Sequence, residues 1–305
     1  MTTSTKSVLL ASVAVLSWST VATAFKVALS YLSVFEMVLI ANLTAVVIFT
    51  ALMAAERQWH RLRSLPMRTV GLCALMGLLN PVAYYLILFS SYDYLPAQVA
   101  QPINYIWPIA LLLLLSIFNK EPIPKRKYIG MIVSLAGLVL IALGGKNITG
   151  EISPLGISMA IISAILWAFY WMINDRIKNT LPESMSLFLG FLFGAIYMVI
   201  ASVFVPVHVP SVNALLSGVY IGIFEMGVPF ICFGLAIRTT HNPALINQMC
   251  YLAPFLSLFF ISMVLREPIV TSTLLGLLLI VAGIVYNQYF AVPQKQKLKQ
   301  SYGNR

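Results

Sequence analysis

The sequence predicts an all-α membrane protein whose ten transmembrane helices form two inverted-topology five-helix repeats. Composition is the first observation: 60% of the 305 residues are apolar and only 9% are charged, against about 45–50% and about 25% in soluble domains. The second is a series of ten apolar stretches of about 20 residues, the length that crosses a hydrocarbon core of about 30 Å. The third is a segment that occurs twice.

The repeated segment keeps its apolar framework and loses its basic residues. Both copies follow the pattern Y-x-x-P … E-P-I … G … G with identical spacing, 146 residues apart. Basic residues follow only the first Glu-Pro-Ile, which indicates that the two loops lie on opposite sides of the membrane. If each copy ends a unit of five spans, an odd number, the second unit enters the bilayer upside down. The first copy contains Tyr105, Pro108, Lys120, Glu121, Pro122, Ile123, Gly130 and Gly137, and the second contains Tyr251, Pro254, Arg266, Glu267, Pro268, Ile269, Gly276 and Gly283.

The spans divide the chain into two repeats and a tail. We expect a first five-helix repeat over 1–146, a second, inverted one over 147–293, and a basic cytoplasmic tail over 294–305. Ala22-Thr23-Ala24 in the first span superficially fits a cleaved signal, but its removal would break the repeat, so a retained helix is expected. The spans are placed near 7–30, 33–55, 68–90, 94–117, 126–144, 154–174, 184–206, 212–237, 242–265 and 269–291.

Lysine and arginine residues give the orientation. The net charge is +10, and with the N-terminus inside, 16 of the 19 basic residues fall on the tails and even-numbered connections. Only Lys26, Lys146 and Arg266 remain for the other side. Because positive residues stay on the cytoplasmic side, both termini are predicted to be cytoplasmic. The charge is therefore no sign of nucleic-acid binding.

Polar side chains gather on the spans that contain prolines. In the fourth span, Gln98, Gln101, Asn104 and Tyr105 fall with Pro108 on one helical face. A proline frees a backbone carbonyl that hydrocarbon cannot satisfy, so such helices are candidates to line a path. Amide and phenol side chains at this depth also form hydrogen bonds between helices, and such a structural role is the alternative to lining a path. The third span offers Asn80, Tyr84 and Tyr85, and the ninth offers Asn247, Gln248 and Tyr251.

An aromatic stripe marks the sixth span. Trp167, Tyr170, Trp171 and Asn174 lie at i, i+3, i+4 and i+7, on one face. The tryptophans start more than ten residues into the span, too deep for simple interfacial anchors. They either fill the core or line an apolar ligand pocket.

Glu225 lies near the centre of the eighth span, where a carboxylate is most costly. It is expected to accept protons or to pair with a cationic group on the cargo, unless it is a protonated acid bonded to a neighbouring helix.

Lys26 and Glu36, near the outer ends of the first two spans, are expected to snorkel and pair. The small-residue faces that Gly130, Gly137 and their repeats form are expected to pack helices rather than to join a dimer.

The twofold pattern and the ten spans resemble the drug/metabolite transporter superfamily, in its ten-helix EamA-type branch. Within that branch, Trp18-Ser19-Thr20, the run from Asn104 to Pro108, and Leu166-Trp167-Ala168 with Tyr170 resemble the bacterial aromatic amino acid exporters. The resemblance implies a multi-pass protein of the bacterial inner membrane with a central cavity that opens to one side at a time. It implies that Trp18, Tyr84, Asn104, Tyr105, Trp107 and Trp167 line that cavity. Glu225 departs from the exporter pattern.

These observations predict a secondary, non-ATP transporter that exports amino acids, aromatic or otherwise apolar, or related small metabolites by alternating access. The alternative is a proton-coupled exporter of organic cations or drugs that uses Glu225. An intramembrane enzyme is disfavoured because the three histidines fall at span ends or in loops and no metal motif occurs. We expect no cofactor or metal, a small-molecule substrate in a lipid bilayer, and a monomer or weak homodimer. The predicted substrate-binding residues are Trp18, Tyr84, Gln101, Asn104, Tyr105, Trp107, Trp167, Tyr170, Trp171, Gln248 and Tyr251, with Glu225 for proton or cation coupling.

Overall fold

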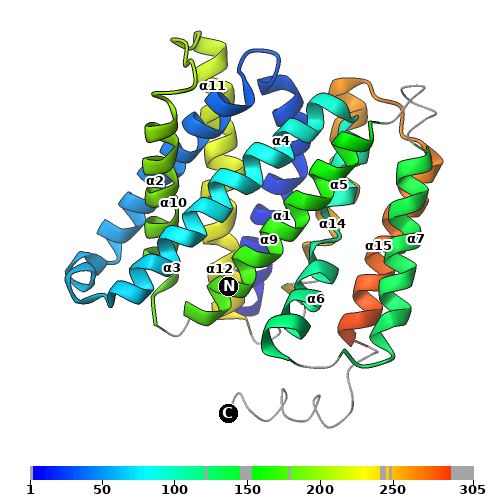
Figure 1. Ribbon diagram of the computed structural model, residues 1–305, viewed down its shortest axis with the longest axis horizontal. Helices are drawn as coiled ribbons and strands as arrows, with labels where there is room; N and C mark the ends of the chain where they lie inside the picture. The colour runs from blue at the N-terminus through cyan, green and yellow to red at the C-terminus, as the bar shows by residue number, and fades with distance from the viewer. Residues whose placement is uncertain are drawn as a thin grey trace.

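The protein is a bundle of long apolar helices (Figure 1). The computed structural model describes residues 3–120, 123–144, 153–177, 180–240, 245–246 and 249–289. Within them, nine helices are long and apolar enough to cross a membrane, and a shorter apolar helix covers Leu252–Leu265. These nine fall on nine of the ten predicted spans. The predicted tail, 294–305, lies outside the described residues.

Several predicted spans are made of more than one helical segment. In the first half of the chain the elements are α1 (Thr3–Ala28), α2 (Val34–Ala55), η1 (Gln58–Ser64), α3 (Met67–Gly77), η2 (Leu78–Ala83), α4 (Tyr84–Tyr94), α5 (Ala97–Asn104), α6 (Trp107–Asn119) and α7 (Lys127–Gly144). In the second half they are α9 (Pro154–Ile177), α10 (Glu183–Ala201), α11 (Val212–Ile221), η3 (Gly222–Gly227), α12 (Val228–Thr239), α14 (Leu252–Phe260), η4 (Ile261–Leu265) and α15 (Thr271–Tyr289).

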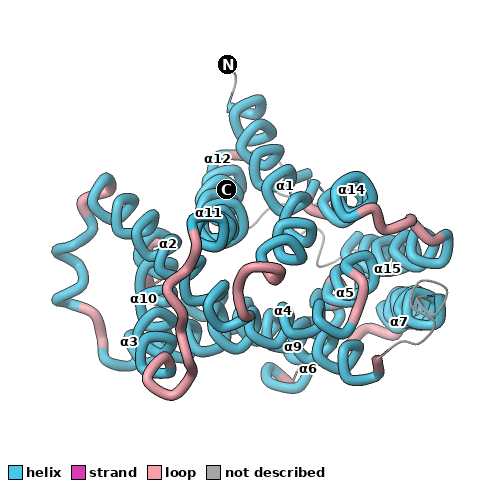
Figure 2. The backbone as a smooth tube through the Cα atoms, turned by 90° about the horizontal axis from the view of Figure 1, so that it is seen from above, coloured by secondary structure: helices cyan, strands magenta, loops and turns pink. Residues whose placement is uncertain are grey.

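The helices group into three parts when viewed from above (Figure 2). One side holds α2, α3 and α10, the other holds α7 and α15, and α1, α4 and α12 lie between them. We call the end that carries the connections 29–33, 95–96 and 266–270 the upper end, as Figure 1 draws it. The lower end carries the connection 56–66, Lys120 and residues 123–126.

Helix irregularities fall in the spans where the sequence places prolines. The third span passes through the π-helical η2, which contains Pro81, and the eighth passes through the π-helical η3, just before Pro229. The fourth span is divided between α5 and α6 at Tyr105 and Ile106, ahead of Pro108. A π segment inside an α-helix is often found at a functional site, because it redirects the side chains that follow.

Local sequence signals explain where other helices begin. Ser33 caps α2 through a capping box, in which its hydroxyl accepts from the Glu36 N–H and the Glu36 carboxylate accepts from the Ser33 N–H. The other carboxylate oxygen of Glu36 accepts from the backbone N–H of His208 at 2.8 Å. Lys26 instead donates to the carbonyl of Tyr92. The expected pairing of Lys26 with Glu36 is therefore wrong, because the cap and the His208 connection occupy that carboxylate.

The two copies of the repeated segment share backbone geometry as well as sequence. Lys120 and Arg266, at equivalent positions, each end a helix in the left-handed conformation, with φ of 55° and 56°. Non-glycine residues adopt positive φ uncommonly. The two equivalent helices therefore end in the same backbone conformation.

The last helices of the two copies, α7 and α15, pack against each other antiparallel (Figure 1). A Cβ on Gly137 would lie 2.4 Å from the carbonyl oxygen of Gly276, and a Cβ on Gly130 would lie 2.4 Å from that of Gly283. Only glycine permits this approach. The small-residue faces therefore join the two halves of one chain.

Candidate functional site

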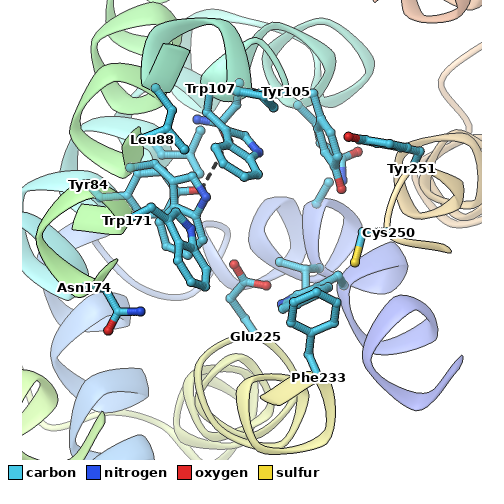
Figure 3. Close-up of a pocket in the computed structure, with 18 of the residues that line it drawn as sticks. Tyr84, Leu88, Tyr105, Trp107, Trp171, Asn174, Glu225, Phe233, Cys250 and Tyr251 are labelled. Atoms are coloured by element: carbon cyan, nitrogen blue, oxygen red, sulfur yellow. Dashed lines mark hydrogen bonds between the residues drawn. The ribbon is translucent and has the colours of Figure 1, made fainter. Parts of the chain in front are cut away.

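A cavity of about 670 Å³ lies between the central helices (Figure 3). Its walls come from α1, α4, α5, α6, α9, η3, α12 and α15 and from Cys250 and Tyr251 just before α14, so both halves of the chain contribute. Residues toward the upper end, such as Phe25 and Tyr92, are buried. At the lower end, the lining residues Asp175 and Gln288 are exposed. The cavity therefore opens toward the lower end of the bundle.

Glu225 presents its carboxylate to the cavity from the π-helical η3 (Figure 3). Two glycines frame this segment and let it approach α2: a Cβ on Gly222 would lie 2.5 Å from Cβ of Thr44, and one on Gly227 would lie 2.6 Å from Ile48. The Glu225 side chain is only 9% exposed, and its Oε1 accepts a hydrogen bond from the Tyr85 hydroxyl at 3.0 Å. A buried carboxylate held in this way can bind a cation or a proton.

A polar chain fixes the amide of Asn104 at the end of α5. The hydroxyl of Tyr84 donates to Asn104 Oδ1 at 3.2 Å, and Asn104 Nδ2 donates to the hydroxyl of Ser163 at 2.8 Å. Ser163 in turn donates to the carbonyl of Ala160. The three helices α4, α5 and α9 thus hold one amide in a single orientation.

Among the described residues, two buried polar atoms of the cavity lining have no hydrogen-bond partner. They are the side-chain oxygen of Gln101 and the indole N–H of Trp171. A buried polar group without a partner is costly. One acceptor and one donor are therefore available to a bound molecule.

Aromatic rings form most of the remaining wall. The rings of Tyr84 and Trp167 lie 4.6 Å apart between centroids, and Trp171 stacks on Trp107 at 6.5 Å. Across the cavity, Trp18 contacts the ring of Phe233 at 5.6 Å. The aromatic side chains of the lining are Trp18, Phe25, Tyr84, Tyr92, Tyr105, Trp107, Trp167, Trp171, Phe233 and Tyr251.

The structure brings most of the predicted site residues to this one cavity. Those that line it are Trp18, Tyr84, Gln101, Asn104, Tyr105, Trp107, Trp167, Trp171, Glu225 and Tyr251. Tyr170 does not line the cavity. It is 3% exposed and packs against the ring of Trp167, with 5.5 Å between the ring centroids. Helical periodicity placed it in the stripe, but the cavity covers only part of that face. Gln248 lies outside the described residues.

Sequence reasoning missed other lining residues. Phe25, Leu88, Tyr92 and Phe233 are apolar or aromatic side chains within apolar spans, and no periodic signal separates them from core residues. Asp175 also lines the cavity, at the lower end of α9. Its acidic side chain follows Asn174 of the aromatic stripe directly in the sequence, and this position could have identified Asp175 as a lining residue.

Comparison with known proteins agrees with the fold. One crystal structure of a protein matches with a TM-score of 0.67 and 22% sequence identity, over 97% of this chain and 99% of that one. Among curated protein sequences, none matches significantly. The EamA-like transporter family matches residues 5–143 and again residues 154–287, once in each half of the chain. The protein therefore belongs to the EamA-like transporter family.

Proposed function

We propose that this membrane transporter exports small organic compounds that carry a protonated amine on an apolar or aromatic body. The observation that carries the proposal is the buried carboxylate of Glu225 inside a wall of aromatic rings. Aromatic faces attract cations, more strongly when water is excluded. The described lining residues contain two carboxylates, of Glu225 and Asp175, and no lysine, arginine or histidine. A cation therefore finds partners there, and an anion finds few.

Neutral amino acids are the second candidate. The indole N–H of Trp171 could donate to a substrate carboxylate, and the side chain of Gln101 offers an acceptor for an ammonium group. Both atoms lie in the same cavity as Glu225. A zwitterion could then span the site, which keeps aromatic or apolar amino acids within the proposed substrate range.

We place the lower end of the bundle in the cytoplasm of a bacterial inner membrane, with both termini on that side. Lys120 and the basic residues of the connection 56–66 and of residues 123–126 lie there, as the positive-inside rule requires. The cavity in this structure then opens to the cytoplasm, as an exporter requires when it loads its cargo. The repeats of 1–146 and 147–293 would rock against each other to expose the site to the opposite side.

The contacts between α7 and α15 support the inverted arrangement of ten spans. Gly130 approaches Gly283, and Gly137 approaches Gly276, which exchanges the equivalent positions of the two copies. Such exchange is what a twofold axis between inverted repeats produces. An axis of this kind in the membrane plane would turn one repeat upside down relative to the other.

Counterflow into proteoliposomes tests the proposal. Vesicles preloaded with a mixture of organic amines and amino acids would be exposed to labelled members of the mixture at two pH values. Uptake of amines that lack a carboxylate supports the proposal, and uptake that falls at low pH indicates competition with protons at Glu225. Uptake confined to amino acids would favour the second candidate. Empty vesicles and the Glu225→Gln variant are the controls.

A further inference from the structure

Gln98 fastens the upper end of α5 to the connection between η4 and α15. Its side chain is fully buried, and its Nε2 donates to the carbonyl of Pro268 at 2.8 Å while its Oε1 accepts from the N–H of Val270 at 3.3 Å. Beside it, the N–H of Ala97 donates to the carboxylate of Glu267 at 3.5 Å. We call these three contacts the upper clamp. They join the two halves of the chain through residues about 170 positions apart.

The second copy of the repeat cannot form the same clamp. The residue equivalent to Gln98 is Ala244, which has no amide. The residues equivalent to Ala97 and Val270 are Pro243 and Pro124, and a proline has no N–H to donate. Both donors and the amide of the clamp are therefore missing at the other end, although the framework of the two copies is otherwise kept.

The clamp lies just above the closed end of the cavity. Ala97 and Gln98 begin α5, two residues after the end of α4. The last turn of α4 carries Tyr92, whose buried ring lines the cavity. Lys26 from α1 donates to the carbonyl of the same Tyr92. Three elements, α1, α4 and the connection 266–270, thus meet at the end where the cavity is shut.

We propose that Gln98 is the residue that keeps the outer end of the transport path closed, and that its asymmetry between the copies makes the inward-open state the resting state. The outer end can open only if the two halves separate there, which breaks the amide contacts to Pro268 and Val270. At the inner end, the equivalent positions hold Pro243, Ala244 and Pro124, which cannot make these hydrogen bonds. This inference rests on the proposed alternating-access cycle and on the orientation given above.

The native thiol of Cys250 reports the accessibility of the cavity, which it lines (Figure 3). In a Cys73→Ser, Cys232→Ser background, a membrane-impermeant maleimide would be applied to the outside of spheroplasts and, separately, to inverted vesicles. With Gln98 intact, Cys250 should react in inverted vesicles and stay protected in spheroplasts. Gln98→Met keeps the length of the side chain and removes both hydrogen bonds. It should raise labelling from outside by about tenfold, the shift expected when two buried hydrogen bonds are lost.

Matched variants separate gating from a loss of structure. Gln58→Met removes an amide from η1 at the lower end and should leave outside labelling unchanged. Gln98→Glu retains an acceptor for the Val270 N–H but loses the donor to Pro268, and should also raise outside labelling. Thermal unfolding in detergent confirms that each variant is folded. If both Gln98 variants are folded and neither admits the reagent from outside, the proposal is wrong.

The labelling needs no knowledge of the cargo. If the Gln98 variants raise outside labelling as expected but counterflow of every tested compound is negative, the proposed substrate class is overturned and the role of Gln98 stands. Labelling of Cys250 from the outer side alone, with Gln98 in place, would overturn the closed outer end and with it this inference.

Discussion

The hydroxyl of Tyr85 in α4 and the carboxylate of Glu225 in η3 meet at 3.0 Å across the two halves of the chain. The hydrogen bond fixes one carboxylate oxygen, Oε1, against the Tyr85 hydroxyl. The other oxygen of the carboxylate can therefore contact a molecule in the cavity. Tyr85 itself is fully buried and does not line the cavity. It is therefore a positioning residue for Glu225, which is proposed to contact the cargo.

Replacing Glu225 by Gln should weaken counterflow of organic amines by at least about tenfold, because a hydrogen bond to a charged group is lost. In the unaltered protein, binding should weaken as pH falls, since proton and amine compete for one carboxylate. The variant should lose this pH dependence. Counterflow measured across a pH series checks both outcomes.

Tyr85→Phe is the control for the Glu225 prediction, because it keeps the ring and the carboxylate and removes only the hydroxyl. It should raise the apparent KM and shift the pH profile without abolishing pH dependence. Unchanged transport in Glu225→Gln, with a folded protein, would reduce the carboxylate to a structural group.

Trp167→Ala should raise the apparent KM for an amine by about 3- to 30-fold, the range of a cation–π contact that is partly desolvated. Trp167 lies against Tyr84 and Trp171 in the wall of the cavity. Phe169→Ala is the matched change on the same helix, because the ring of Phe169 contacts Phe118 and does not line the cavity. Equal loss of transport in both variants would point to packing of α9 instead.

Gly137→Ala should destabilise the protein by about 1–3 kcal/mol through overpacking, because its Cβ would lie 2.4 Å from the Gly276 carbonyl. Gly71→Ala, where a Cβ meets nothing within 4 Å, should be neutral or stabilising by up to about 1 kcal/mol. Thermal unfolding in one detergent compares the two variants. A Gly137→Ala protein as stable as the Gly71→Ala protein would contradict the close contact of α7 and α15.

A reporter protein that is active only in the cytoplasm should be active when it is fused after Arg305. The prediction follows from the basic residues that the lower end and the tail share. The same reporter placed in the connection 206–210, at the upper end, is the internal control and should give the opposite result. A periplasmic reporter after Arg305 would reverse the orientation and the direction in which the cavity opens.

The length of the apolar runs predicted ten spans, of which the described residues show nine, because in a bilayer the length of an apolar helix is set by the membrane. The resemblance to EamA-type exporters implied that Trp18, Asn104 and Trp167, from three different spans, line one cavity, and the structure brings all three to one cavity. Deep amide side chains are costly to leave facing hydrocarbon, so their positions carry information.

Periodicity could not predict how the polar face of the fourth span is divided. Gln98, Gln101 and Asn104 share that face, yet Gln98 reaches the loop of the other repeat and the other two line the cavity. The partner of Glu225 was equally hidden, since Tyr85 lies 140 residues away. Contacts between distant segments depend on how the helices are placed, which a single helical pattern does not encode.

Ser134 and Ile280 occupy equivalent positions in the two copies, and they bond to each other: the Ser134 hydroxyl donates to the Ile280 carbonyl at 3.0 Å. A contact between a position and its own counterpart is the mark of a self-complementary surface. One short ancestral chain, present in two antiparallel copies, would therefore have sufficed to specify the α7–α15 pairing before any fusion of genes. Two identical subunits must carry the same residues at both ends, whereas the two halves of one chain can differ, as they do at the positions of the upper clamp.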